Sequence, residues 1–371
     1  MTAPLIVLAA GGTGGHVFPA EALAVELLGR GCRLALVTDR RGGAYGGALG
    51  SLETHRIQAG GLAGKSLLAR LRAVPELLIG TFQARALLAR LMPSVVVGFG
   101  GYASVPTMMA AALSGVATAL HEQNAVLGRA NRLLAHRVKR IATSFEAVDA
   151  VPPEARDRLV HTGMPVRPAI AAVRERPYPE LSSDGPVDLL VLGGSQGARV
   201  LSDVLPAAVG LLPEGLRHRL SIVQQCRPED LERTAAAYAD RGLTPTLSAF
   251  FDDVPERLAA CHLLIGRAGA STVAEATAVG RPSILVPYPH AIDDHQSANA
   301  HAVDEAGAGW LMQQDSFTPE TLAARLQALL AQPAILAKAA ACAHAAGRPD
   351  AAARLGDLVL DLLPAHERNA A

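Results

Sequence analysis

Two glycine-rich segments are the first places in this sequence where the residue types and their spacing could do chemistry. Segment 11–16, GGTGGH, follows the apolar run 5–10, and segment 193–198, GGSQGA, follows the apolar run 187–192. A glycine-rich turn between a strand and a helix lets the backbone approach an anion, and the N–H groups of the first helical turn favour negative charge. We therefore predict phosphate binding at both turns, against the alternative that these glycines only permit tight turns.

Neither turn matches the dinucleotide fingerprint G-x-G-x-x-G. Val17 stands where the first turn would need its third glycine, and Leu192 stands where the second would need its first. Segment 59–66, AGGLAGKS, approaches the P-loop pattern, but Ala59 replaces its first glycine, and 54–58 before it are too polar for a buried strand. A nicotinamide-dependent enzyme and a P-loop NTPase are therefore both disfavoured.

No group of residues has the spacing of a metal site or of a disulfide framework. The aspartates at 252–253 and at 293–294 form adjacent pairs, and neighbours on a strand point to opposite faces. The 4 cysteines lie far apart without a C-x-x-C spacing. We predict free thiols and no bound metal.

Strand-like and helix-length segments alternate along the chain, and this alternation positions the two glycine turns. The short apolar runs that read as strands are 5–10, 34–38, 95–98, 117–120, 140–143, 187–192, 220–223, 262–266 and 283–286. Alternation of this kind implies right-handed βαβ crossovers and parallel sheets, so we predict an α/β fold with two doubly wound domains. Proline and glycine at 163–168 mark the expected boundary, 177–186 reads as a solvated entry to the second sheet, and 333–363 reads as helices.

Composition sets limits on size, partners and location. The chain has 371 residues, of which 50% are hydrophobic, and 34 basic residues balance 34 acidic ones. This length predicts two domains, and zero net charge argues against nucleic acid as the main partner. We find no run of about 20 apolar residues that would predict a membrane-spanning helix, and the N-terminal run reads as a strand rather than a signal peptide.

Seven motifs in a fixed order carry a resemblance to a known family. They are GGTGGHVFPA (11–20), GFGGYASVP (98–106), HEQNAVLGRAN (121–131), TGMPVR (162–167), GGSQGA (193–198), AGASTVAEA (268–276) and DDHQSANA (293–300). Together they resemble the MurG family of UDP-N-acetylglucosamine transferases, which make the lipid II precursor of peptidoglycan.

The resemblance implies the GT-B fold, in which a deep cleft separates two Rossmann-like domains. Residues 1–165 would form the acceptor- and membrane-binding domain, and 166–345 would form the domain that binds the UDP-sugar donor. A C-terminal helix within 346–371 would return to the first domain.

The resemblance also implies a reaction and its partners. The family transfers N-acetylglucosamine (GlcNAc) from UDP-GlcNAc to the 4-hydroxyl of the N-acetylmuramoyl (MurNAc) sugar in undecaprenyl-pyrophosphoryl-MurNAc-pentapeptide (lipid I), with inversion at the anomeric carbon. We expect no tightly bound cofactor, although a loosely held Mg²⁺ on the diphosphate is compatible. Other proteins of cell-wall synthesis are compatible partners.

An inverting transfer needs a general base beside the acceptor hydroxyl. His16 is our first candidate because an imidazole can take up a proton near neutral pH, with a sugar hydrogen bond or a helix cap as its alternative roles. Glu122, within the polar run 121–124, is the rival base. That run follows an apolar strand and is expected outside the core, with a solvated turn as the simpler interpretation.

Further site residues are carried over from the family's motifs, and two of them have ordinary alternatives. On the donor side they are Thr13, Gly14, Gly15, Asn124, Arg167, Ser195, Gln196, Phe251, Ala270, Ser271, Thr272, Glu275 and Gln296. On the acceptor side they are Gly14, Gly15, Tyr102 and His121. Arg167 could instead form a surface ion pair, and the spacing of Thr272 and Glu275 also fits a capping box at a helix start.

The sequence departs from the family's pattern at two positions. Met164 stands where the family usually has Asn, and His295 stands where a Gln often precedes Gln296. Met cannot hydrogen-bond as an amide does, so the surroundings of Arg167 and the donor specificity are the features that these changes could affect.

Segment 62–91 mixes leucines and a phenylalanine with basic residues and contains Pro75. Alone it reads as helices packed on the first sheet with solvated basic faces. With a lipid-linked acceptor we expect it to lie on an anionic membrane surface, which places the protein peripherally on the cytoplasmic face of the cell membrane.

Two other interpretations stay open at this point. The same fold could act on a different donor or acceptor sugar, because spacing alone fixes neither. A noncatalytic nucleotide-sugar-binding protein would bind UDP and transfer nothing, and Met164 keeps that alternative open.

Overall fold

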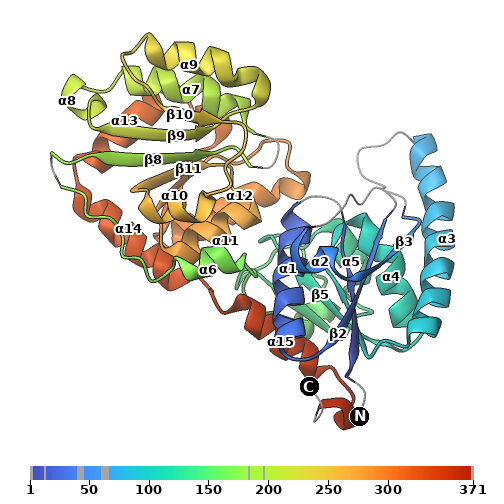
Figure 1. Ribbon diagram of the computed structural model, residues 1–371. Helices are drawn as coiled ribbons and strands as arrows, with labels where there is room; N and C mark the ends of the chain where they lie inside the picture. Colours follow the sequence, from blue (N-terminus) through green and yellow to red (C-terminus); the bar gives the residue numbers. More distant parts are fainter. Residues whose placement is uncertain are drawn as a thin grey trace. The chain divides into compact units, whose positions relative to one another are not determined.

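The computed structural model describes residues 3–11, 14–39, 46–59, 67–182, 184–194 and 197–368 (Figure 1). The chain divides into two compact units, Met1–Arg167 with Asp350–Ala371, and Pro168–Pro349. The chain passes from the first unit to the second at 167/168 and returns at 349/350, where the sequence predicted boundaries at 165/166 and 345/346.

The first unit contains a parallel sheet of seven described strands in the order β3-β2-β1-β4-β5-β6-β7. This order places β1, which precedes the first glycine turn, beside β4 at the centre of the sheet, as in Rossmann-type folds. The strands are β1 (Leu5–Ala9), β2 (Arg33–Asp39), β3 (Glu53–Ile57), β4 (Val95–Gly98), β5 (Ala117–Glu122), β6 (Arg140–Thr143) and β7 (Leu159–His161).

Helices cover both faces of this sheet because its central strands are apolar on both sides. In β1, Ile6 and Leu8 join a cluster with α1 and α15, whereas Val7 and Ala9 join a cluster with α3, α4 and α5. The helices of this unit are α1 (Gly14–Gly29), α2 (Gly47–Gly50), α3 (Leu67–Leu91), α4 (Gly101–Leu113), α5 (Arg129–Leu134), the 3₁₀ helix η1 (Pro153–Arg158), α15 (Ala351–Asp361) and α16 (Ala365–Arg368).

Helix α15 returns to the first unit although it is formed by the end of the chain. Its Leu355 and Val359 are fully buried against α1, and the Arg30 guanidinium donates to an Asp357 carboxylate oxygen at 2.6 Å. The end of the chain therefore forms part of the core of the first unit.

The second unit repeats the plan with a parallel sheet of six described strands in the order β10-β9-β8-β11-β12-β13. The strands are β8 (Val187–Leu192), β9 (Leu220–Gln225), β10 (Thr246–Ser248), β11 (Leu263–Gly266), β12 (Ser283–Leu285) and β13 (Gly309–Leu311). The α-helices are α6 (Pro168–Ala172), α7 (Arg199–Gly210), α8 (Glu214–Arg217), α9 (Leu231–Ala239), α10 (Val254–Ala260), α11 (Ala270–Val279), α12 (His295–Glu305), α13 (Pro319–Leu330) and α14 (Pro333–Ala346). Short 3₁₀ helices are η2 (Pro228–Asp230), η3 (Ile292–Asp294) and η4 (Gln314–Ser316).

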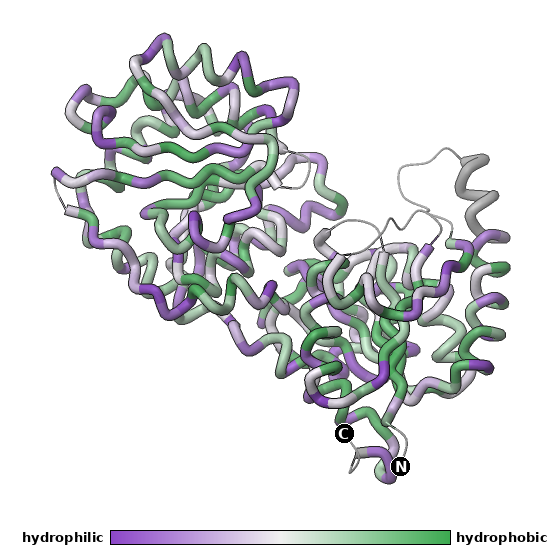
Figure 2. The backbone as a smooth tube through the Cα atoms, viewed as in Figure 1, coloured by the Kyte–Doolittle hydropathy of each residue, from purple (hydrophilic) through white to green (hydrophobic). Residues whose placement is uncertain are grey.

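Every apolar run predicted as a strand overlaps a strand, and the strands that the prediction missed are those at the two edges of each sheet. They are β3 and β7 in the first sheet and β10 and β13 in the second. Strand β3 reads ETHRI, and only its last residue is buried. Figure 2 shows the hydrophobic segments concentrated along the central strands, so the outer strands lack the apolar signal on which the prediction relied.

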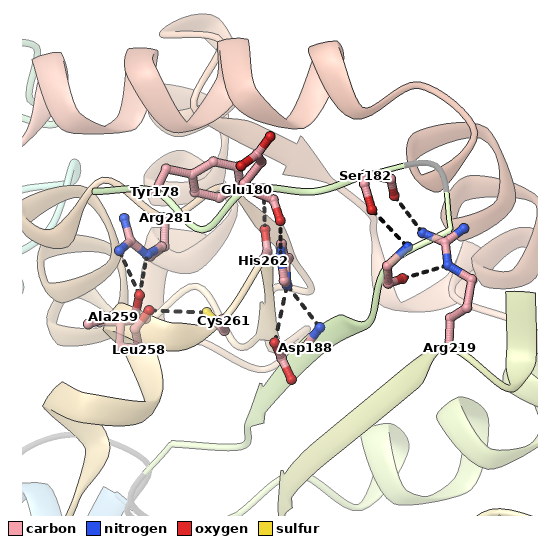
Figure 3. Close-up of polar contacts among 11 residues, drawn as sticks. Tyr178, Glu180, Ser182, Asp188, Arg219, Leu258, Ala259, Cys261, His262 and Arg281 are labelled. Carbon is pink, nitrogen blue, oxygen red and sulfur yellow. Dashed lines mark hydrogen bonds and ion pairs between the residues drawn. The ribbon is translucent and has the colours of Figure 1, made fainter. Parts of the chain in front are cut away.

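Segment 177–182 contains no buried residue, as expected of a solvated entry to the second sheet, but half-buried Tyr178 anchors it (Figure 3). The Tyr178 hydroxyl donates to the His262 carbonyl at 2.8 Å, and the Arg281 guanidinium lies 5.6 Å from the Tyr178 ring. Arg281 is only 2% exposed and donates to backbone carbonyls, including that of Ala259 at 2.7 Å. Asp188, which donates its backbone N–H to His262, lies at the amino end of β8. This network therefore lies at the amino ends of β8 and β11, opposite the end of the sheet where the glycine turn follows β8.

Two further observations concern the whole chain. All four cysteines are free thiols, as predicted. Among the described residues no single helix has the length and apolar composition to cross a membrane. One pair of helical segments, Pro319–Leu330 and Pro333–Asp361, which are bent by 92° relative to each other, meets these two criteria together, but by length and composition only.

Candidate active site

The first glycine turn connects the carboxyl end of β1 to α1, whose first residues are Gly14, Gly15 and His16. Thr13 lies outside the described residues. The half-buried His16 ring lies against the turn between β4 and α4. A Cβ added to Gly101 in that turn would be 3.4 Å from Nε2 of His16. Gly100 and Gly101 have φ of 81° and 68°, so this turn needs glycine for its backbone conformation.

The polar run 121–124 is a buried network, and the expectation that it lies outside the core is wrong. His121, Glu122 and Gln123 are 0%, 2% and 2% exposed, and only Asn124 is half-buried. The run ends β5 beside β4, so its side chains meet those of the neighbouring turns inside the first unit. Burial is possible here because each side chain finds hydrogen-bonding partners.

His121 has protein partners at both ring nitrogens. Its Nε2 lies 3.3 Å from the Gly163 carbonyl, and its Nδ1 lies 3.1 Å from the amide nitrogen of Gln123. Burial lowers the pKa of His121 to about 4. A neutral and fully enclosed imidazole has no surface for a sugar, so the prediction that His121 contacts the acceptor is wrong.

The Glu122 carboxylate organises the turn that follows β5. Its oxygens accept four hydrogen bonds: from the backbone N–H groups of Asn124 at 3.1 Å and Gly128 at 2.8 Å, and from the side-chain amides of Asn124 at 3.3 Å and Asn131 at 2.8 Å. Because its lone pairs are engaged, Glu122 is poorly placed to take a proton from a hydroxyl. Of the two base candidates, the geometry favours His16.

Arg167 lies at the end of the first unit rather than in the second, where the expected boundary placed it. Its guanidinium carbon is 5.4 Å from the centre of the Phe18 ring on α1. Met164 is 5% exposed and packs as an apolar residue. Tyr102, the second residue of α4, packs half-buried against the cluster formed with α3 to α5.

The second glycine turn follows β8, and Ser195 and Gln196 at its tip lie outside the described residues. On either side of them, Gly194 and Gly197 have φ of 78° and 68°. A Cβ at Gly193 would lie 2.5 Å from the Ala198 nitrogen, so the turn is too tight for any other residue there. These glycines therefore shape the turn, which is compatible with anion binding by its backbone.

Helix α11 follows β11 at the same edge of the second sheet. Ala270, Ser271 and Thr272 form its first turn, and Gly269 is the N-cap without a side-chain cap. The alternative of a capping box at Thr272 and Glu275 is therefore wrong, because the helix begins two residues before Thr272. Glu275 is 9% exposed and lies one turn further along the helix.

The remaining donor-side candidates have partners within the second unit. The Arg257 guanidinium carbon lies 4.5 Å from the centre of the Phe251 ring. The Gln296 side-chain oxygen accepts the Tyr288 backbone N–H at 2.9 Å. At His295, where the family often has Gln, Nδ1 lies 2.7 Å from the Ile292 carbonyl oxygen.

Two polar residues at the strand ends, buried Gln123 and half-buried Arg267, were missed by the sequence analysis. Gln123 contacts His16, and its place inside the run 121–124 was the only available signal. Arg267 follows β11 and donates to the Val286 carbonyl at 3.1 Å, and burial lowers its pKa. A single arginine after a strand forms no motif, so its position became visible only in the fold.

Metal ligation has no candidate in the part of the chain that the structure describes. No three His, Cys, Asp or Glu side chains gather there in a way that could hold an ion. The backbone at Asp293 and Asp294 is left-handed, with φ of 55° and 50°, and leads directly into α12.

Two Rossmann-like units, each with a glycine turn after its first strand, define the GT-B class of glycosyltransferases. The chain belongs to glycosyltransferase family 28. Residues 6–143 match the family's N-terminal domain, and residues 188–355 match its C-terminal domain.

Relatives and solved structures narrow the comparison. The chain is 64% identical over 361 residues, 97% of each chain, to the UDP-N-acetylglucosamine–N-acetylmuramyl-(pentapeptide) pyrophosphoryl-undecaprenol N-acetylglucosamine transferase of Paramagnetospirillum magneticum. The transferase of the same name from Rhodospirillum centenum is 60% identical, over 96% of this chain and 93% of its own. The crystal structure of Acinetobacter baumannii MurG is similar with a TM-score of 0.79 and 31% identity, covering 96% of this chain and 99% of that one. The calicheamicin glycosyltransferase CalG4, at 17% identity and a TM-score of 0.64 over 98% of each chain, shares the fold.

Proposed function

We propose that this protein transfers GlcNAc from UDP-GlcNAc to the 4-hydroxyl of MurNAc in lipid I, which yields lipid II for peptidoglycan synthesis. The observation that carries this proposal is the 64% identity, over 97% of both chains, to a transferase named for that reaction. The two glycine turns and the enclosed network around His16 supply sites suited to its chemistry.

The chemistry proposed is a single displacement with inversion that forms a β-1,4 linkage. The acceptor O4 attacks the anomeric carbon of GlcNAc, and its proton moves to Nε2 of His16. The bond from that carbon to the UDP oxygen breaks, and UDP leaves with the electron pair. No glycosyl-enzyme intermediate is needed, so one base and stabilisation of the diphosphate suffice.

On the donor side, we propose that backbone N–H groups bind the diphosphate. The second glycine turn and the first turn of α11, at Ala270, Ser271 and Thr272, follow neighbouring strands and therefore face the same sheet edge. Ser195, Gln196, Arg167 and Thr13 would add donors to the phosphates. A helix N-terminus stabilises negative charge without a metal, although a loosely held Mg²⁺ is compatible.

Other proposed contacts divide between uridine and the two sugars. Glu275 would accept hydrogen bonds from the ribose hydroxyls, and the Phe251 ring would flank uracil. Gln296 and Asn124 would contact the donor sugar. Gly14, Gly15 and Tyr102 would form the acceptor side, with the two glycines also close to the donor.

In addition to these substrate contacts, we propose that α3 contacts the membrane. Leu78, Ile79 and Phe82 are 57%, 47% and 72% exposed and lie within five residues on one helix, so they bring apolar surface together. Exposed Arg85 and Arg90 lie further along the same helix. Figure 2 shows hydrophobic and hydrophilic residues mixed along the described part of α3. We propose peripheral attachment to the anionic cytoplasmic leaflet, where lipid I would be reached.

Vesicle flotation tests this attachment. The double variant Leu78→Gln/Phe82→Ser should lose most of its binding to vesicles that contain an anionic lipid, while transfer to a short-chain acceptor in detergent should stay within about twofold of wild type. Leu211→Gln is the matched control, because Leu211 is 56% exposed in the second unit. Binding by the double variant equal to that of the control would refute the membrane role of α3.

The reaction itself is tested by donor competition. Purified protein should transfer labelled sugar from UDP-GlcNAc to a short-chain lipid I analogue in preference to UDP-GalNAc and UDP-glucose, and should do so in EDTA. Binding of UDP-GlcNAc without disaccharide formation would mean that the acceptor or the catalytic residues are wrongly assigned.

A further inference from the structure

Gln123 lies between His16 and three acceptor groups of the first unit. Its side-chain oxygen is 3.2 Å from Nδ1 of His16. Its nitrogen donates to the Phe99 carbonyl at 2.9 Å and to the His121 carbonyl at 3.1 Å, and lies 3.1 Å from Nδ1 of His121. Gln123 is 2% exposed, so water does not compete for these partners.

The orientation of the Gln123 amide follows from these partners. Carbonyl oxygens can only accept hydrogen bonds, so the group that faces Phe99 O and His121 O must be the NH₂ group. The reverse orientation would place three oxygens against one another. The third neighbour agrees, since His121 donates from Nε2 to the Gly163 carbonyl and its Nδ1 is then an acceptor when the ring is neutral.

This orientation fixes the tautomer of His16. The Gln123 oxygen is an acceptor, so Nδ1 of His16 must carry the hydrogen. A neutral imidazole with hydrogen on Nδ1 has its lone pair on Nε2, the nitrogen that a base would use. We propose that Gln123 is a positioning residue that selects the Nε2 lone pair of His16 for catalysis.

This inference deepens the proposed function and rests on it for its catalytic consequence. Phe99 follows β4, Gln123 follows β5, and His16 lies at the start of α1, so three neighbouring strand ends set the geometry. Gln123 itself has no contact with substrate in this scheme. Its effect is transmitted through the hydrogen-bonded His16 ring.

Two substitutions separate positioning from simple filling of the core. Gln123→Glu keeps an oxygen acceptor opposite Nδ1 but loses the donor to Phe99 O, so it should be the less stable variant. Gln123→Met keeps the length of the side chain without burying a charge, but it offers no acceptor of comparable strength. We expect kcat at pH 8 to fall at least tenfold in Gln123→Met and by less in Gln123→Glu, with KM for UDP-GlcNAc within twofold of wild type in both. A filling role would make Gln123→Met at least as active as Gln123→Glu.

Gln224→Met is the matched control for loss of a buried amide. Gln224 is fully buried in β9 of the second unit and accepts the Tyr238 hydroxyl at 2.7 Å. It should lower the melting temperature while leaving kcat within about threefold of wild type. An equal loss of kcat in Gln224→Met and Gln123→Met would overturn the proposal.

A spectroscopic measurement tests the tautomer without activity. The full-length protein with ring-¹⁵N-histidine is measured at pH 8, and the His16 signals are assigned by their loss in His16→Gln. We expect hydrogen on Nδ1 and a pyridine-type Nε2 in wild type, and a shift toward the other tautomer in Gln123→Met. Hydrogen on Nε2 in the wild-type protein overturns the inference, even where transfer is observed. Failure of wild-type transfer with the expected tautomer would instead refute the proposed function.

Discussion

Glu122 and His16 show how a carboxylate and an imidazole in one site take different tasks. The Glu122 carboxylate accepts backbone hydrogen bonds from Asn124 and Gly128, which are orphan donors of a buried turn. His16 lies at the start of a helix, with one ring nitrogen held by Gln123. The carboxylate therefore stabilises the turn, and the proposed function assigns proton transfer to the imidazole.

Alanine substitutions should separate these two tasks. His16→Ala should lower kcat by about 100-fold or more, because a general base contributes that much, with little change in melting temperature. Glu122→Ala should destabilise the protein by on the order of 3 kcal/mol, because it leaves buried donors without acceptors. Steady-state kinetics and thermal unfolding measure both. Glu122→Ala with an unchanged melting temperature and abolished turnover would return Glu122 to the role of base.

His121 predicts how stability depends on pH. Burial lowers the pKa of His121 in the folded protein to about 4, from 6.5 for an unperturbed histidine. Between these values the unfolded chain binds a proton that the folded chain does not, so stability falls as pH drops from about 6.5 toward 4. His121 therefore contributes up to about 3 kcal/mol to this loss of stability, at 1.36 kcal/mol per unit of difference in pKa.

Thermal unfolding at pH 7.5 and pH 5.0 measures this dependence. His121→Gln keeps a donor for the Gly163 carbonyl but does not titrate, so the drop in melting temperature between the two pH values should be smaller in the variant than in wild type. Equal drops would show that His121 is not the group responsible.

Among secondary-structure elements, the sequence predicted those that are buried and missed those that are not. Central strands such as β1 and β8 carry continuous apolar runs because helices cover both of their faces. Edge strands such as β3 and β7 are exposed or half-buried over most of their length, so their residues follow no such pattern. Their position could be found only from pairing with neighbouring strands.

The candidate site was predictable to the extent that backbone geometry determined it. The glycine turns follow from local sequence, because positive φ and tight contacts require glycine. Burial of 121–123 was not predictable, because it depends on partners such as Phe99 and Gly163 that lie far away in the sequence. Long-range hydrogen bonds leave no local pattern.

Helix α15 should stabilise the first unit as much as a helix formed by the N-terminal part of the chain does. Leu355 is fully buried against α1, so Leu355→Ala should reduce the free energy of unfolding by about 2–5 kcal/mol. Arg354→Ala is the control on the same helix, because Arg354 is exposed and forms a surface ion pair with Asp350, and it should change stability by less than about 1 kcal/mol. Urea unfolding of the full-length protein checks both. Equal effects would mean that α15 does not belong to the core of the first unit.

At the scale of the whole molecule, two units of similar topology present different residues at the helices that follow their central strands. The first glycine turn leads into a helix that begins with Gly14, Gly15 and His16, and so presents a titratable side chain. In the second unit the neighbouring helix α11 begins with Ala270, Ser271 and Thr272, and so presents backbone N–H groups and hydroxyls. This asymmetry fits proton transfer in one unit and binding of the diphosphate in the other.

The most direct test of this account is the structure of the reaction product. Purified protein is incubated with UDP-GlcNAc and a short-chain lipid I analogue, and the disaccharide is examined by NMR. The account predicts one new glycosidic bond from C1 of GlcNAc to O4 of MurNAc, with the β configuration that inversion of the α-linked donor produces. An α linkage, a bond to another hydroxyl, or hydrolysis of UDP-GlcNAc without transfer would contradict it.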